Sequence, residues 1–243
     1  MHSKNHKSAV DILLTALVAA AAVALTWAGL RGSKDIAVAA NASANSIELP
    51  DDAFVVVVDA GHGGFDGGAT GSKTGVAEAE LNLAVAKLLS SELTARGFYV
   101  VMTRETDEAL AKTKSEDMRM RSSIMRLPEA DIVVSIHMNK FDDSSVSGPM
   151  VFYMKNSAEG QALAECVITN ICFEIGRPPR YSNPEDLFVL REPAVPSVLV
   201  ECGFLSNAED EAKLMDEYYR QEIARGIANG IADYAAALKH RDG

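Results

Sequence analysis

Hydrophobic residues follow two different periods along the chain from residue 54 onward. Residues 54–59 read FVVVVD and residues 131–137 read DIVVSIH, and such short continuous apolar runs are typical of strands buried on both faces of a sheet. Residues 78–96 instead place apolar side chains every three or four positions, which predicts an amphipathic helix that ends at Gly97. The same reasoning predicts further strands at 99–103, 148–154, 187–190 and 197–201, and further helices at 115–125, 158–175, 208–215 and 217–238.

The order of these predicted elements indicates the fold class. Strands alternate with helices, which favours an α/β fold with a mostly parallel, twisted sheet and helices on both of its faces. No internal repeat is visible, and residues 51–243 are enough for one domain. Folds of this kind bind their ligands beyond the carboxyl ends of the strands, so we expect the chemistry there.

The first fifty residues have a different pattern. Lys4 and Lys7 stand in a short basic start, and residues 12–30 contain no charged residue. A run of this length can cross a membrane as a helix, and basic residues before it favour a carboxyl end outside the cytoplasm. We therefore predict a cytoplasmic tip and transmembrane anchor in residues 1–31 and a small-residue linker in residues 32–50. A cleaved signal peptide, which would release a secreted protein, and a buried core helix are the alternatives.

Charge and cysteine content narrow the function classes. Residues 1–50 carry four basic and three acidic side chains, so of the chain's net charge of −11 a charge of −12 falls on residues 51–243. A nucleic-acid-binding domain needs a basic face, so we expect no nucleic-acid partner. The three cysteines, Cys166, Cys172 and Cys202, include no Cys-x-x-Cys pair, which argues against a disulfide framework and against a structural zinc site built from thiolates.

Titratable residues follow three of the predicted buried strands. His62 comes after the first strand, His137 ends the third, and Glu201 ends the last. Glu78 lies in the first turn of the first long helix, where the helix macrodipole favours a carboxylate. Two histidines and a carboxylate are a known ligand set for catalytic zinc, and a further carboxylate can act as general base on a water. Together these four residues contain the parts that metal-assisted hydrolysis needs.

Each of these residues also has a plainer interpretation. His62 could cap a turn of the glycine-rich loop, His137 could be a half-buried histidine with satisfied hydrogen bonds, and Glu78 could be only a helix N-terminal acid. Glu201 is harder to explain in this way, because a charge at the end of a buried strand needs a partner or a function. Motifs of other enzyme classes are missing: there is no His-Glu-x-x-His, no Gly-x-Ser-x-Gly and no P-loop, and a dinucleotide-binding fingerprint is broken at Asp66.

The four residues lie in segments that resemble the motifs of the zinc-dependent N-acetylmuramoyl-L-alanine amidases, a family of bacterial cell-wall hydrolases. The segments are DAGHGG at 59–64, GVAEAELNL at 75–83, SIHMN at 135–139 and ECGFLSN at 201–207. Their order and spacing agree with the family over roughly residues 54–238. The resemblance implies that His62, Glu78 and His137 bind Zn²⁺, that Glu201 is catalytic, and that the substrate is peptidoglycan.

Other positions are less directly tied to the family's motifs. We predict that Arg104 and Asn139 contact the substrate. Ala60 stands where the family usually has proline, Met138 where it has a small residue, and Cys202 where it has threonine. None of these departures removes a predicted metal ligand.

A narrower resemblance is to the spore-cortex amidases of endospore formers. The segments MTRETDEAL at 102–110 and KTKSEDMRMR at 112–121 carry it, together with an anchor that has no wall-binding repeats beside it. It implies action on cortex peptidoglycan during formation of muramic δ-lactam. The place of action would be the space between the forespore and mother-cell membranes, and an activating lipoprotein is a candidate partner. A vegetative lytic amidase and a catalytically inactive module that grips stem peptides are the alternatives.

Overall fold

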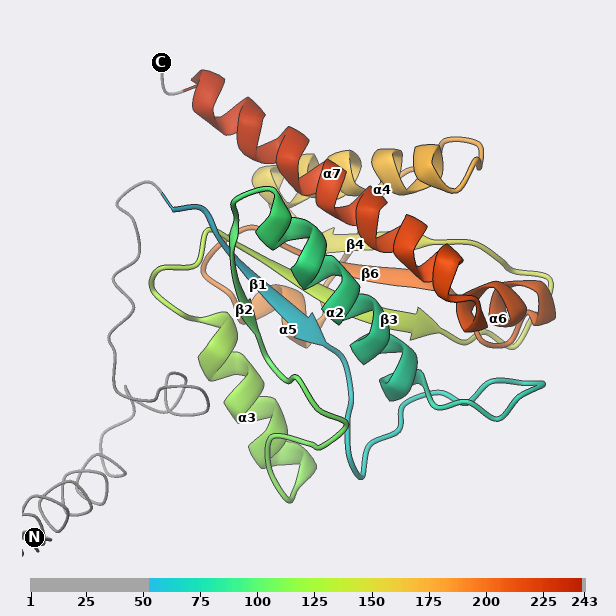
Figure 1. The fold of residues 1–243 in the computed structure, drawn as a ribbon. Helices are drawn as coiled ribbons and strands as arrows, with labels where there is room; N and C mark the ends of the chain where they lie inside the picture. Colours follow the sequence, from blue (N-terminus) through green and yellow to red (C-terminus); the bar gives the residue numbers. More distant parts are fainter. Residues whose placement is uncertain (1–52, 242–243) are drawn as a thin grey trace, which may run out of the picture. The chain divides into compact units, whose positions relative to one another are not determined.

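The computed structural model describes residues 53–241, which form six strands and six helices (Figure 1). The anchor predicted in residues 1–31 and the linker predicted in residues 32–50 lie outside the described residues. Between residues 53 and 241, no helix combines the length and the apolar character that a membrane span requires.

A six-stranded mixed sheet forms the centre of the fold. Its strands are β1 (Val55–Ala60), β2 (Tyr99–Met102), β3 (Ile132–Asn139), β4 (Met150–Met154), β5 (Asn183–Glu185) and β6 (Ser197–Phe204). They lie in the order β2-β1-β3-β6-β4-β5. All neighbouring pairs are parallel except β4 and β6, which run antiparallel. The prediction of a mostly parallel sheet is therefore confirmed, with β4 and β5 as the part that reverses direction.

Helices cover both faces of the sheet (Figure 1). They are α2 (Glu78–Ala95), α3 (Lys114–Met125), α4 (Ala158–Glu174), α5 (Phe188–Arg191), α6 (Ala208–Met215) and α7 (Glu217–Arg241). Val56 and Val58 of β1 pack into a large core with α2, α4 and α7, whereas Val57 between them packs with Met125 of α3 on the other face. Because successive side chains of a strand point to opposite faces, this run of valines is buried on both sides, as its sequence predicts.

Helix α7 lies across α4 at short range. A Cβ atom at Gly226 would come within 2.7 Å of the Cα of Ile171, and one at Gly230 would come within 2.5 Å of the Cα of Val167. Glycine is therefore needed at both positions for the two backbones to approach so closely. Since α7 also packs against α2, it closes the larger core from the outside (Figure 1).

The structure differs from the sequence prediction near β5. Residues 187–190, predicted as a strand, lie mostly in the short helix α5 (Phe188–Arg191). The strand between β4 and β6 in the chain is instead β5, whose sequence Asn-Pro-Glu carries no hydrophobic pattern. Pro184 is compatible with β5 because this strand lies at the edge of the sheet and pairs on one side only.

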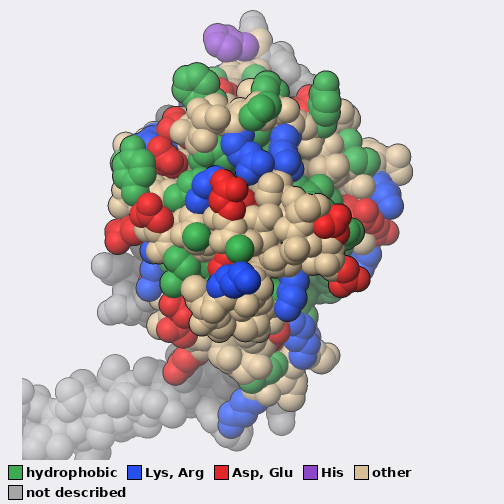
Figure 2. Space-filling view, turned by 90° about the vertical axis from the view of Figure 1, so that its right-hand side faces the viewer, with side chains coloured by type: hydrophobic (Ala, Val, Ile, Leu, Met, Phe, Trp, Pro, Cys, Tyr) green, Lys and Arg blue, Asp and Glu red, His purple; other side chains and the backbone are tan. Residues whose placement is uncertain are grey.

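The parallel strands β1, β3 and β6 bring their carboxyl ends to one edge of the sheet. In register, Asp59 lies beside Ser135, and His137 lies beside Glu201. Figure 2 views the molecule from the side toward which the arrowhead of β3 points in Figure 1. Acidic, basic and hydrophobic side chains are interspersed on that face, so the described residues present no continuous basic surface there.

Candidate metal centre

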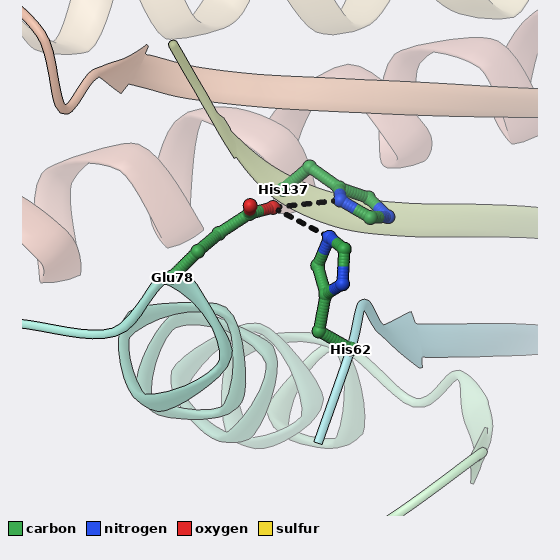
Figure 3. Close-up of side chains that lie close together, drawn as sticks. All are labelled: His62, Glu78 and His137. Atoms are coloured by element: carbon green, nitrogen blue, oxygen red, sulfur yellow. Dashed lines mark hydrogen bonds and ion pairs between the residues drawn. The ribbon is translucent and has the colours of Figure 1, made fainter. Parts of the chain in front are cut away.

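Three predicted ligands meet at this edge of the sheet. His62 follows β1, Glu78 is the first residue of α2, and His137 lies in β3. Each offers one ligand atom, and the three atoms lie within 4.8 Å of one another (Figure 3). The Oε1 atom of Glu78 lies 2.8 Å from Nδ1 of His137 and 3.2 Å from Nε2 of His62. Two imidazoles and a carboxylate at this spacing can hold a divalent metal ion.

The ring of His62 is oriented by a second carboxylate. Its Nδ1 atom lies 2.9 Å from Oδ2 of Asp66, which also accepts a hydrogen bond from the ammonium group of Lys114. Although burial opposes ionisation, the hydrogen bonds from Lys114 and His62 hold the pKa of Asp66 at about 2. Because Asp66 contacts Nδ1, Nε2 is the ligand atom that His62 offers on the side of Glu78.

Glu78 is buried and fixed on both of its oxygens. Oε2 accepts from the backbone N–H of Ala69 at 2.8 Å, and Oε1 accepts from Nδ2 of Asn82 at 3.2 Å. Burial alone would raise the pKa of Glu78, but the two histidines beside it hold the pKa well below its usual value. The carboxylate is therefore kept ionised, which is the state that binds a metal.

A glycine allows His137 to reach this position. A Cβ atom at residue 61 would lie 2.3 Å from the imidazole of His137, so the ring can pack against the chain only where residue 61 has no side chain. The glycine-rich loop after β1 thus makes room for one ligand and carries another.

Glu201 lies on β6, opposite His137. Its side chain is half-buried, and its Oε2 atom is buried without a hydrogen-bond partner among the described residues. Burial raises the pKa of Glu201 to about 7, the negative charge of Glu78 acting in the same direction and the two histidines opposing it. A carboxylate with this pKa can both accept and return a proton near neutral pH.

The two residues predicted to contact substrate have different surroundings in the structure. Asn139 is the last residue of β3, half-buried, and its Oδ1 accepts from the backbone N–H of Lys140. Arg104 is buried, and its guanidinium donates to four backbone carbonyls, those of Ala60, Gly61, Ala79 and Thr106. A substrate contact by either residue stays a prediction. Two of the hydrogen bonds of Arg104 go to the carbonyls of the two residues that precede His62.

Several functional neighbours of the ligands were not predicted. Asp66 orients His62 from four positions along the same loop, and Asp59 pairs with Arg121 at 2.7 Å beneath that loop. A sequence signal exists for Asp59, because an acid that directly follows four buried valines needs a partner. No comparable signal exists for Arg121, since its position in a polar helix also suits a solvent-exposed residue.

The family model described as N-acetylmuramoyl-L-alanine amidase matches residues 56–233. The chain belongs to this family. The match spans all four motif segments and includes each of the residues His62, Glu78, His137 and Glu201.

Individual relatives of this amidase cover most of the described domain. The chain is 31% identical over 195 residues to the germination-specific N-acetylmuramoyl-L-alanine amidase of Bacillus subtilis, covering 76% of this chain and 81% of that one. It is also 31% identical to the amidase LytC of Bacillus subtilis, but it spans only 37% of that longer protein.

Solved structures agree with the fold of this amidase. The CwlD amidase from Clostridioides difficile, determined in complex with the GerS lipoprotein, superimposes with a TM-score of 0.73 at 33% identity, covering 76% of this chain and 99% of that chain. The catalytic domain of CwlV from Bacillus (Paenibacillus) polymyxa gives a TM-score of 0.68 at 34% identity, with 75% and 98% covered. The sequence resemblance is thereby confirmed at the level of family and fold.

Proposed function

We propose that this amidase cleaves the amide bond between the lactyl group of N-acetylmuramic acid and L-alanine in peptidoglycan, with Zn²⁺ held by His62, Glu78 and His137. The observation that supports it most is the meeting of these three donors beside a buried, unpartnered carboxylate oxygen of Glu201. The donor set fits zinc, because two neutral imidazoles and one carboxylate leave a coordination position open for water.

The proposed mechanism divides the work among the four residues. When bound, zinc polarises the scissile carbonyl and lowers the pKa of water toward about 7. Glu201 accepts the proton of the attacking water and then returns it to the nitrogen of the leaving alanine. In the metal-free protein burial raises its pKa to about 7, which suits a group that first accepts and then returns a proton. Asp66 holds the Nδ1 atom of His62 and so keeps the ring oriented with Nε2 toward the metal site.

The setting of the reaction is also proposed. The uncharged run of residues 12–30 behind a basic start supports a membrane anchor in residues 1–31, followed by a linker in 32–50 and the catalytic domain in 51–243, outside the cytoplasm. Similarity to the germination-specific amidase and to CwlD supports action on spore-cortex peptidoglycan. The complex of CwlD with the GerS lipoprotein supports a lipoprotein partner for this amidase too.

One experiment tests the reaction and the metal site together. The purified full chain is incubated with peptidoglycan, with and without zinc, and the released fragments are identified by mass. We expect stem peptides with a free L-alanine amino group, and about one zinc per chain by metal analysis. His62→Ala and His137→Ala should lose both zinc and activity, whereas Glu201→Gln should keep zinc and lose activity about 10²–10⁴-fold.

The outcomes separate the parts of the proposal. Fragments cut at another bond would refute the substrate bond, and undiminished zinc in both histidine variants would refute the ligand set. Deletion of the gene in a spore-forming host should leave growth unchanged and remove muramic δ-lactam from the spore cortex. Normal lactam content would instead favour a vegetative lytic role, the alternative that the sequence leaves open.

A further inference from the structure

The chain turns sharply where it leaves the sheet after β1. His62 has a φ of 61°, and Gly63 and Gly64 follow with φ values of 134° and 56°. A residue that bears a side chain is disfavoured in the left-handed region, so His62 holds this conformation only if its surroundings impose it. The backbone carbonyls before and within the turn also leave the ladder of the sheet and need other donors.

Two buried guanidinium groups supply those donors. Arg104 donates from Nε to the carbonyl of Ala60 at 2.9 Å and from Nη2 to that of Gly61 at 3.0 Å. Arg121 donates from Nη1 to the carbonyl of Ala60 at 2.7 Å and from Nη2 to the carbonyl of His62. The carbonyls of three successive residues, 60–62, therefore accept hydrogen bonds from two arginines.

The arginines are themselves fixed by neighbouring elements. Arg121 lies between Asp59 of β1 at 2.7 Å and Asp117 of α3 at 2.8 Å. The carboxylate of Asp59 also accepts from the hydroxyls of Thr103 at 2.8 Å and Ser135 at 2.6 Å. Two positive and two negative groups thus balance within a buried cluster that joins β1, the segment after β2, β3 and α3.

We propose that Arg104 and Arg121 are positioning residues of the metal centre: by binding the carbonyls of residues 60–62 they hold the left-handed turn that directs His62 at the ion, and so set the affinity for zinc. This inference rests on the proposed function, because it takes zinc to be the ion that His62 binds. The planar fork of arginine matters here, since lysine keeps the charge but cannot bind two carbonyls in fixed directions.

The test compares three arginine-to-lysine variants of the full chain. Arg104→Lys and Arg121→Lys remove the fork at the turn. Arg126→Lys is the matched control, because Arg126 follows α3 directly and donates to the carbonyl and the carboxylate of Glu192 without contact to the turn. Zinc affinity is measured by competition with a chromophoric chelator, and the geometry of the site by the absorption spectrum of the cobalt-substituted protein.

We expect zinc affinity to fall about 10–100-fold in Arg104→Lys and Arg121→Lys, the usual effect of losing a group that orients a metal ligand. Their cobalt spectra should change, Arg126→Lys should match the wild type in both measurements, and the metal-free variants should remain folded by circular dichroism. Wild-type affinity and spectrum in both variants would overturn the inference while leaving the zinc site standing. Unfolding of both variants would also overturn it, since their role would then lie in the fold. Absence of zinc from the wild type would refute the proposed function first.

Discussion

Replacing Glu201 with glutamine should make the metal-free protein more stable, although it lowers the activity of the zinc-loaded enzyme about 10²–10⁴-fold. Burial raises the pKa of Glu201 from an ordinary 4.5 to about 7 in the folded chain. Each pKa unit is worth about 1.4 kcal/mol, so ionising this carboxyl in the folded, metal-free protein costs about 3 kcal/mol. Glutamine has nearly the same shape and cannot ionise, so the variant avoids that cost.

The effect has a defined pH window. An acid whose pKa is higher in the folded than in the unfolded chain binds more protons when folded, between pH 4.5 and about 7. The stability that Glu201 contributes in its neutral form is therefore complete below pH 4.5 and is lost as the pH rises through about 7. The advantage of Glu201→Gln should grow from near zero at pH 4.5 to about 3 kcal/mol at pH 8, which is roughly 6–12 °C in Tm for a domain of this size.

Thermal unfolding in the presence of a chelator, at several pH values from 5 to 8, measures this difference. Glu80→Gln is the control, because Glu80 is exposed on α2 and its replacement should leave the pH profile unchanged. Parallel pH profiles for the wild type and Glu201→Gln would refute the reasoning, since they would show that Glu201 does not titrate in a buried environment.

Three further changes test the construction of the site. Asp66→Ala removes the acceptor that orients His62 and should weaken zinc binding about 10–100-fold by chelator competition, and an unchanged affinity would contradict this role. Gly61→Ala places a Cβ 2.3 Å from an imidazole ring and should cost about 1–3 kcal/mol in unfolding free energy, whereas Gly67→Ala, with a nearest atom at 3.7 Å, should cost little; equal Tm values would argue against the packing described. Glu211→Gln replaces the carboxylate that accepts from the backbone N–H groups of residues 73 and 74, and it should lower the free energy of unfolding by about 1–3 kcal/mol at pH 7. Because those hydrogen bonds hold its pKa at about 2 despite burial, the loss should shrink as the pH falls from 4.5 toward 2, and a pH-independent loss would contradict it.

Local sequence patterns predict the central part of the fold. The valines of β1 are apolar at every position because both faces of the sheet are covered, so the run could be identified without knowing its neighbours. The short segment from Leu187 to Leu190 could not, because an apolar run of four residues has no distinguishable period. The sequence does not predict β5, because its pairing with β4 is made by backbone groups and its three residues show no hydrophobic pattern.

In the site, the ligands could be predicted from the sequence, but the residues that hold them could not. His62 lies just beyond β1, whereas β3 and β6 continue two and three residues past the ends predicted at His137 and Glu201. All three residues still lie toward the carboxyl ends of buried strands, and parallel strands bring such ends together. The partners of these residues were not predictable, because Arg104 and Arg121 act on backbone carbonyls, and every residue has one. Which carbonyls a guanidinium reaches depends on how α3 and the loop after β2 pack beneath the turn, and no local pattern encodes that packing.

The position of α7 has a consequence for the order in which the protein folds during synthesis. This helix is the last of the described elements, yet it covers both α2, the helix that begins with Glu78, and α4. Domains form from the amino end during synthesis at about 5–20 residues per second, but here the apolar faces of α2 and α4 must wait for residues 217–241. A nascent chain that stops before residue 217 therefore exposes the core lined by Leu89 and Val167. Chaperone binding should persist on such truncated chains and should end only once the final helix has emerged.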